Sequence, residues 1–182
     1  MGRDKALAPL AGRPMIAHVL DRLGTQVAGL AIAAGANPER FAALGVNAFE
    51  DPPNGRRGPL GGVCAGLSRA RSLGYDAIVT APCDGPFLPL DLAARLLAAA
   101  RQGGAALARD PRSLHPTFAL WFLEAAGEAE RLLENGEGPL ALAESLGASA
   151  ALFDDAEALA NINTQAELAA AARRLAASNP PA

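Results

Sequence analysis

The chain has 182 residues, of which 51% are hydrophobic and 19% are charged. This length suffices for one sizeable hydrophobic core and is short for two, so we expect residues 1–182 to form a single domain. The formal net charge of -3 lacks the basic excess that nucleic-acid-binding proteins carry. A bound nucleotide would therefore be a small molecule rather than part of a nucleic acid.

The cysteines and the apolar runs exclude further classes. Cys64 and Cys83 are the two cysteines, and they have no C-x-x-C spacing, so neither a zinc site nor a disulfide framework is predicted. No apolar run reaches the roughly 18 residues of a membrane span, and the first residues lead into no long apolar signal region. We expect a cytoplasmic monomer that does not bind membranes.

The first quarter of the chain alternates between helix and strand. It opens on a charged, loop-like segment that contains Lys5, and Pro14 suits the first position of a helix. A buried strand is predicted at 27–34, a short helix at 38–44 and a short strand at 46–49. This alternation predicts an α/β domain with a right-handed parallel crossover.

A long loop is predicted at residues 50–62, which are dense in glycine, proline and charge. Asp51 stands at its start, after a strand, and glycines stand at its end, where a helix begins. Such a helix start presents free N–H groups to an anion, and long loops in compact domains are commonly functional. A plain solvated connection is the alternative, in which Arg56 and Arg57 are surface charges rather than phosphate contacts.

The segment T-A-P-C-D-G-P-F-L-P-L, residues 80–90, follows a strand predicted at 75–80 and precedes a helix predicted at 88–100. It places Asp84 at the C-terminal end of a strand, which is where open α/β sheets bind ligands. Position alone leaves two interpretations. Asp84 either caps the turn or holds a divalent cation against a phosphate.

The second half of the chain continues the same pattern. Strands are predicted at 105–108 and 116–122, and the polar segment between them ends in His115. Pro116 favours an extended backbone at His115. From spacing alone, His115 is predicted to lie in a loop. A short strand is predicted at 150–153. Thr164 and Glu167 form a capping box for a last helix at 165–177, and Asn161 and Asn163 before it suit a turn.

Five motifs in this order carry a resemblance to a known family: M-G-R-D-K-A-L, G-P-L-G-G-V, P-C-D-G-P-F-L-P, H-P-T-F-A-L-W and N-I-N-T-Q-A-E-L. Together they resemble the molybdenum cofactor guanylyltransferases, which are MobA-like NTP transferases. The H-P-T-F-A-L-W and N-I-N-T motifs are the more specific ones. The resemblance implies a Rossmann-like three-layer nucleotidyltransferase fold with a mostly parallel sheet. It also implies transfer of GMP from GTP to molybdopterin, with release of pyrophosphate and a need for Mg²⁺.

The resemblance assigns roles to individual residues. Lys5 matches the family lysine that contacts the triphosphate, and Asp84 matches the acid that holds Mg²⁺, so these two would be the catalytic pair. Asp51 matches a further acid that contacts the nucleotide. His115, Asn161 and Asn163 fall in segments on the molybdopterin side. GTP and molybdopterin are the implied small-molecule partners, and other proteins of cofactor biosynthesis are candidate protein partners.

The family begins with a strand and a leucine-alanine-glycine-glycine loop that do not precede Met1 here. Without that central strand, two neighbouring strands would have unpaired edges beside an apolar trough. We therefore expect an N-terminally truncated chain in which Met1 is an internal methionine. Two alternatives follow: a catalytically impaired homologue that binds nucleotide or pterin, and a related nucleotidyltransferase that uses CTP or a sugar phosphate.

Overall fold

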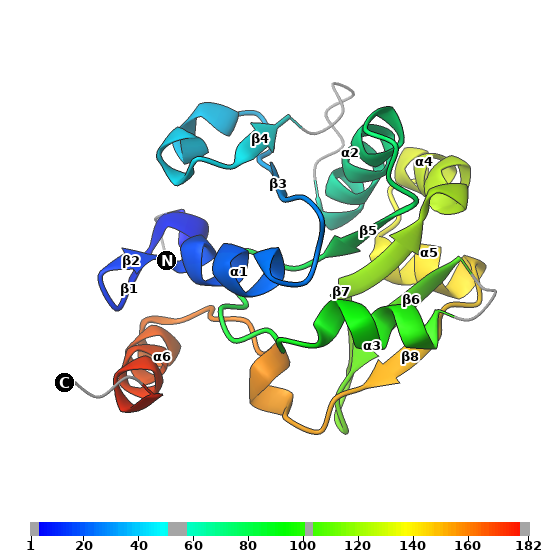
Figure 1. Ribbon diagram of the computed structural model, residues 1–182. Coiled ribbons are helices and arrows are strands. Elements are labelled where there is room, and N and C mark those ends of the chain that lie inside the picture. The colour runs from blue at the N-terminus through cyan, green and yellow to red at the C-terminus, as the bar shows by residue number, and fades with distance from the viewer. Residues whose placement is uncertain (1–3, 51–57, 101–103, 179–182) are drawn as a thin grey trace.

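The computed structural model describes residues 4–50, 58–100 and 104–178. Its largest sheet has the strand order β5-β7-β6-β8, formed by Ala77–Thr80, Leu114–Phe122, Ala105–Arg109 and Ser149–Leu152 (Figure 1). β7 is antiparallel to β5 and to β6, whereas β8 is parallel to β6. Three of these strands thus run in one direction, and the predicted α/β class is confirmed with a mixed sheet.

Helices cover both faces of this sheet, because side chains along each strand alternate between two cores. Ala105, Leu107 and Trp121 pack with α2 (Pro59–Ser72), α4 (Ala126–Glu134) and α5 (Pro139–Ser145). The other core contains Ala106 and Phe118, which pack with α1 (Met15–Gly24) and α3 (Leu92–Ala99). This is the predicted three-layer arrangement, and Trp121 is fully buried, as a core residue should be.

A second parallel pair, β3 (Ala31–Ala33) and β4 (Asn47–Phe49), is joined by the 3-10 helix η2 (Pro38–Leu44). This is the predicted crossover, although β3 is shorter than the strand expected at 27–34. A small hairpin of β1 (Pro9–Leu10) and β2 (Arg13–Pro14) precedes α1. Its turn residues Ala11 and Gly12 both have positive φ, which suits a tight two-residue turn.

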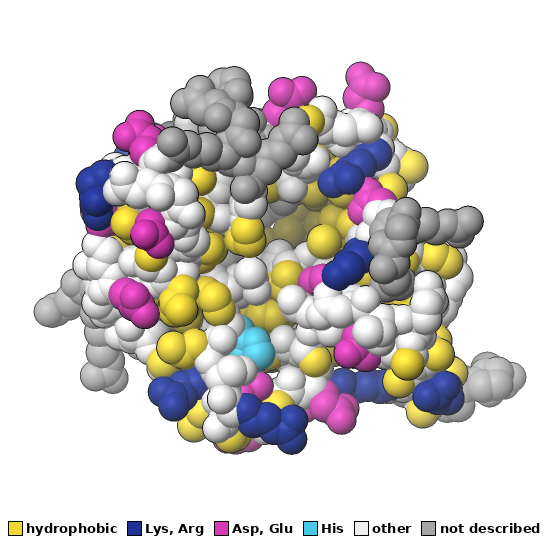
Figure 2. All heavy atoms as spheres, turned by 180° about the vertical axis from the view of Figure 1, so that it is seen from behind, with side chains coloured by type: hydrophobic (Ala, Val, Ile, Leu, Met, Phe, Trp, Pro, Cys, Tyr) yellow, Lys and Arg dark blue, Asp and Glu magenta, His cyan; other side chains and the backbone are white. Residues whose placement is uncertain are grey.

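β3 and β5 are not paired with each other. Within the described residues β3 pairs with β4 alone and β5 with β7 alone, so each strand has one edge without a ladder. Helix α2 packs against both strands, with Gly62 close to Ala33 and Gly66 close to Ile78. All four residues of β5 are partly exposed, in agreement with its place at the edge of its sheet. The predicted unpaired edges are present, and Figure 2 shows hydrophobic side chains within a hollow on one face of the molecule.

Two sequence predictions in this region were wrong in detail. The helix expected from residue 88 begins at Leu92, because Pro86 and Pro89 keep the preceding residues in turns. His115 lies in β7 rather than in a loop, paired with Ala108. The register shifts between Leu107 and Ala108, and this irregularity accommodates Pro116, which cannot donate to a sheet ladder.

The C-terminal elements return to the N-terminal segment. After β8 come η4 (Ala156–Leu159) and α6 (Gln165–Ser178). A small core cluster of Leu10, Met15, Ile162 and Ala171 packs the hairpin and α1 against α6. Short 3-10 turns at Lys5–Leu7 (η1) and Leu123–Ala125 (η3) complete the described elements. The first described elements and α6 therefore lie on the same side of the domain (Figure 1).

Candidate active site

Asp84 lies in the turn that follows β5, as the sequence predicted. Its carbonyl oxygen accepts a hydrogen bond from the Ile162 N–H at 2.8 Å, and Gly85 N–H donates to the Pro82 carbonyl at 3.3 Å. A Cβ on Gly85 would lie 2.6 Å from Cζ of Phe118, which is fully buried and has little room to move. Glycine is therefore required here for close packing, and the turn is fixed on two sides.

The carboxylate of Asp84 is half-buried, and its charge is only partly compensated by the surrounding protein. Burial raises its pKa, while a hydrogen bond to its own backbone and the charge of Lys5 lower it by less. No side chain of the described residues donates a hydrogen bond to this carboxylate. Besides the bond to its own backbone, this carboxylate keeps oxygen lone pairs that no side chain of the described residues occupies, and these fit a cation ligand.

Lys5, at the start of η1, reaches across the molecule to the C-terminal segment. Its Nζ donates a hydrogen bond to Oδ1 of Asn163 at 2.7 Å. The positive charge of Lys5 also lowers the pKa of Asp84, and the Ile162 N–H, next to Asn163 in the chain, donates to the Asp84 carbonyl. The structure thus brings together three of the predicted site residues: Lys5, Asp84 and Asn163.

The turn that carries Asn163 is held by the predicted capping box. Oε2 of Glu167 accepts the N–H groups of Asn163 and Thr164 at 2.7 and 2.8 Å, and Glu167 N–H donates to Oγ1 of Thr164 at 3.2 Å. The first two bonds are the main reason that the pKa of Glu167 is lowered. Asn161 is exposed and makes no side-chain hydrogen bond within the described residues.

Two charged residues of this region had no role in the sequence prediction. Oδ2 of Asp4 forms an ion pair with Nη1 of Arg40 at 2.8 Å, and Nη2 of Arg40 donates to the Ala34 carbonyl at 3.2 Å. Desolvation, followed by the negative charges of Asp84 and Asp4, raises the pKa of the Cys83 thiol to about 11. The position of Asp4 next to Lys5 in the first motif could have pointed to it as a site residue. No motif in the sequence contains Arg40, so no such signal was available for it.

His115 is held by a buried acid. Its Nε2 lies 2.9 Å from Oδ2 of Asp110, whose Oδ1 accepts the N–H groups of Arg112 and Ser113 at 2.6 and 2.7 Å. These contacts, led by the bond to His115, lower the pKa of Asp110 to about 2. The ring of His115 meets that of Phe118 edge to face, with centroids 6.2 Å apart.

Phe118 in turn contacts the Asp84 turn at Gly85, so one aromatic ring separates His115 from that turn. Within the described part of the chain, no hydrogen bond joins His115 to Lys5 or Asp84. Asp51, Arg56 and Arg57 lie outside the described residues. The predicted loop bounds of 50–62 were wrong at the C-terminal end, because the helix already begins at Pro59, with Gly58 at the N-cap position.

No group of three or more histidine, cysteine, aspartate or glutamate side chains is arranged to hold a metal ion in residues 4–50, 58–100 and 104–178. A closed protein cage for a metal is therefore not present in these segments. Mg²⁺ in nucleotide sites commonly uses one or two carboxylates and completes its shell with phosphate oxygens and water. The single half-buried carboxylate of Asp84 fits that open mode of binding.

A cation and a half-buried carboxylate that interact electrostatically lie beyond the end of a strand in a three-layer α/β domain. This is the arrangement of a nucleotidyltransferase, in which the protein mainly neutralises charge and aligns phosphates. The family model of the MobA-like NTP transferase domain matches residues 1–152. The chain is also 43% identical to a molybdenum cofactor guanylyltransferase of Cereibacter sphaeroides over 93% of its length and 87% of the relative. The chain belongs to the family of MobA-like molybdenum cofactor guanylyltransferases, as its motifs predicted.

Further comparisons agree with this membership. A molybdenum cofactor guanylyltransferase of Acidiphilium cryptum is 41% identical over 93% of this chain and 86% of the relative. Among solved structures, molybdopterin-guanine dinucleotide biosynthesis protein A of Archaeoglobus fulgidus superposes with a TM-score of 0.76 over 97% of this chain and 92% of that one, at 20% identity. The 2-C-methyl-D-erythritol 4-phosphate cytidylyltransferase of Thermus thermophilus superposes with a TM-score of 0.69 over 94% of this chain and 93% of that one, at 19% identity. At such identities these two likenesses establish the fold alone.

Nucleotidyltransferases of this kind typically need a divalent metal ion, which the open carboxylate of Asp84 could bind. In the segments that the structure describes, no helix is both long and apolar enough to cross a membrane.

Proposed function

We propose that this chain transfers GMP from GTP to the terminal phosphate of molybdopterin, with release of pyrophosphate and with Mg²⁺ as the divalent ion. The observation that carries the proposal is the meeting of Lys5, Asp84 and Asn163, which come from two distant ends of the chain and the middle. The 43% identity to a molybdenum cofactor guanylyltransferase supports the choice of substrates.

In the proposed reaction an oxygen of the molybdopterin phosphate attacks the α-phosphorus of GTP. The bond from that phosphorus to the bridging oxygen of the β-phosphate breaks, and pyrophosphate leaves with the electron pair. The ammonium group of Lys5 would bind the triphosphate and stabilise negative charge on it. To do so, Lys5 would exchange its bond to Asn163 for one to phosphate.

Asp84 would hold Mg²⁺, which neutralises phosphate oxygens when bound. The carboxylate is available for this role because no side chain of the described residues donates to it, and a bound cation would stabilise the charge that burial disfavours. We infer that Asp51 contacts the nucleotide. His115, Asn161 and Asn163 would face the molybdopterin side, where Asp110 and Glu167 fix two of them.

The test is to incubate the full chain with GTP, molybdopterin and Mg²⁺ and to measure pyrophosphate release and GMP incorporation. We expect both in equal amounts, with loss of both when a chelator removes the metal. CTP and ATP in place of GTP should give little product. Preferred use of CTP, or of a sugar phosphate as acceptor, would contradict the proposed substrates.

A second function is favoured by the edges of β3 and β5 that carry no ladder within the described residues. A homologue that binds nucleotide or pterin without turnover would tolerate such an open sheet. Equilibrium binding of GTP and of molybdopterin, measured beside the transfer assay, separates the two functions. Binding of either ligand without any transfer would support the binding protein, and transfer would exclude it.

A further inference from the structure

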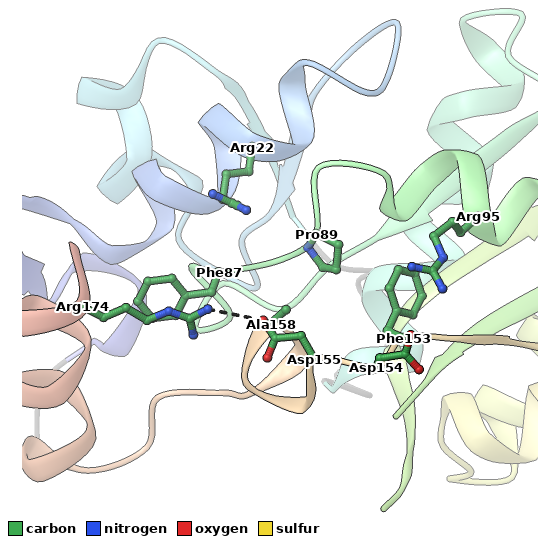
Figure 3. A pocket seen from close by; sticks show the side chains of 9 residues that line it. All are labelled: Arg22, Phe87, Pro89, Arg95, Phe153, Asp154, Asp155, Ala158 and Arg174. Atoms are coloured by element: carbon green, nitrogen blue, oxygen red, sulfur yellow. Dashed lines mark hydrogen bonds and ion pairs between the residues drawn. The ribbon is translucent and has the colours of Figure 1, made fainter. Parts of the chain in front are cut away.

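A pocket of about 290 Å³ lies between α1, the segment that follows Asp84, and the connection from β8 to α6 (Figure 3). Three arginines from three different helices line it: Arg22 of α1, Arg95 of α3 and Arg174 of α6. None of the described residues proposed for guanylyl transfer lines this pocket. It is therefore a separate feature of the molecule.

Two of the arginines stack on aromatic rings. The guanidinium carbon of Arg174 lies 4.2 Å from the ring centroid of Phe87, and that of Arg95 lies 4.2 Å from the centroid of Phe153. Such stacking orients the planar guanidinium group and lowers the entropy lost when it binds a ligand. Figure 3 shows these two pairs at opposite ends of the pocket.

Both stacked arginines also have acidic partners. Arg174 lies 3.5 Å from Asp155 and 3.4 Å from Glu157, and Arg95 lies 3.6 Å from Asp91. Their charges are thus largely balanced within the protein.

Arg22 differs from both. Its Nε donates to the Leu88 carbonyl at 2.6 Å, but neither Nη atom has a hydrogen-bond or ion-pair partner in the described segments. Burial, and to a lesser degree the positive charge of Arg174, lower the pKa of Arg22. In Figure 3 its guanidinium group points into the pocket. The partly buried guanidinium group of Arg22 therefore faces the positive charge of Arg174 and has no acidic partner among the described residues.

The aspartates of the pocket do not supply that acid. Asp155 pairs with Arg174, and Asp154 is exposed and forms no ion pair with Arg22 among the described residues. A partly buried charge without a partner is unfavourable, and a bound anion would relieve it.

We propose that this pocket binds a small organic anion, whose phosphate or carboxylate oxygens contact the two Nη atoms of Arg22 and the guanidinium group of Arg174. Phosphate and carboxylate share the oxygen geometry that a guanidinium fork recognises. Phe87, Pro89 and Ala158 provide the apolar wall for the rest of the ligand. The proposal does not depend on guanylyl transfer, because no residue of that reaction takes part.

The experiment is a calorimetric titration of the full chain with inorganic phosphate and, separately, with citrate, at low ionic strength because salt screens such contacts. We expect saturable binding of at least one of them. Arg22→Gln should weaken it by about tenfold or more. Phosphate tighter than citrate indicates a phosphate ligand, and the reverse indicates a carboxylate ligand.

Two variants locate the binding. Arg131→Gln is the matched control, since it removes one arginine charge that is exposed and paired with Glu128 on the other face of the sheet. Lys5→Ala removes the cation of the candidate active site. Both should leave the affinity of the arginine pocket unchanged. The proposal would be overturned if Lys5→Ala abolished anion binding while Arg22→Gln left it intact.

Because Arg22 also binds the Leu88 carbonyl, its variant could fail to fold. A second measurement uses the unaltered protein: arginine modification by phenylglyoxal, followed by mass spectrometry of peptides. Phosphate or citrate should slow modification of Arg22 and Arg174 and leave that of Arg131 unchanged. Absence of saturable binding by either anion, or equal modification rates with and without it, would refute the site.

Discussion

Lys5 and Asn163 are 158 positions apart, yet Nζ of Lys5 donates to Oδ1 of Asn163 at 2.7 Å. This bond closes the N-terminal segment onto the turn before α6 and places a cation beside Asp84. The same turn contributes the Ile162 N–H to the Asp84 carbonyl at 2.8 Å. A substrate phosphate that takes Lys5 from Asn163 would thus release the hydrogen bond between the N-terminal segment and this turn, and the bond from Ile162 to Asp84 would remain.

Lys5→Ala should weaken GTP affinity by about tenfold or more, because a charge-assisted bond to phosphate is lost. Equilibrium binding of GTP by calorimetry measures the effect. Asn163→Ala is the matched control, since it frees the lysine without removing its charge and should leave GTP affinity equal or higher. An unchanged affinity in Lys5→Ala would argue against the phosphate role.

Asp84→Asn should lower Mg²⁺-dependent GMP transfer by far more than tenfold while the fold is kept, because the amide cannot supply the negative charge that holds the ion. The rate of pyrophosphate release measures it, and circular dichroism checks the fold. Activity within about tenfold of the unaltered protein, or roughly 1.4 kcal/mol of barrier, would show that Asp84 is not the main metal ligand.

Gly85→Ala should destabilise the protein by about 1–3 kcal/mol through overpacking. The new Cβ would lie 2.6 Å from Cζ of the buried Phe118. Urea denaturation measures the change. Gly127→Ala in α4 is the matched control, because nothing lies within 4 Å of its Cβ and alanine favours a helix. If both variants had the same stability, the contact with Phe118 would not be the reason for glycine at position 85.

The bond between Asp110 and His115 predicts a pH dependence of stability. The pKa of Asp110 is lowered from 3.8 to about 2 in the folded protein, so its contribution is complete above pH 3.8 and is lost as the pH falls toward 2. Urea midpoints measured from pH 5 to pH 2 should show a shallower decline in His115→Asn than in the unaltered protein. Parallel declines in the two proteins would contradict this origin of the shift.

Thr164→Ala should cost about 1 kcal/mol of stability, because the Glu167 N–H loses its acceptor at the start of α6. Since the same box fixes the turn of Asn163, molybdopterin affinity should fall as well, while GTP affinity should change less. Thr164→Ser retains the hydroxyl group and should restore both properties. A loss that serine does not restore would assign the effect to the methyl group instead.

Local patterns in the sequence predicted elements that depend on neighbouring residues. The capping box of Thr164 and Glu167 and the strand before Asp84 occur as expected, and the short helix expected at 38–44 is present as a 3-10 helix. Boundaries were less accurate where long-range pairing decides them. His115 belongs to a strand because Ala108 pairs with it, and no local pattern contains that partner.

By itself, the sequence determined the α/β class and the family, and it showed that Lys5, Asp84 and Asn163 lie in motifs that resemble those of the family. Periodicity and ordered motifs are local properties of a chain, so they can be read without the structure. Only the tertiary structure decided which side chains meet. The Lys5–Asn163 bond, the Asp4–Arg40 pair and the arginine pocket all join residues from separate elements. Such contacts depend on how helices and strands pack in three dimensions, so spacing along the chain does not reveal them.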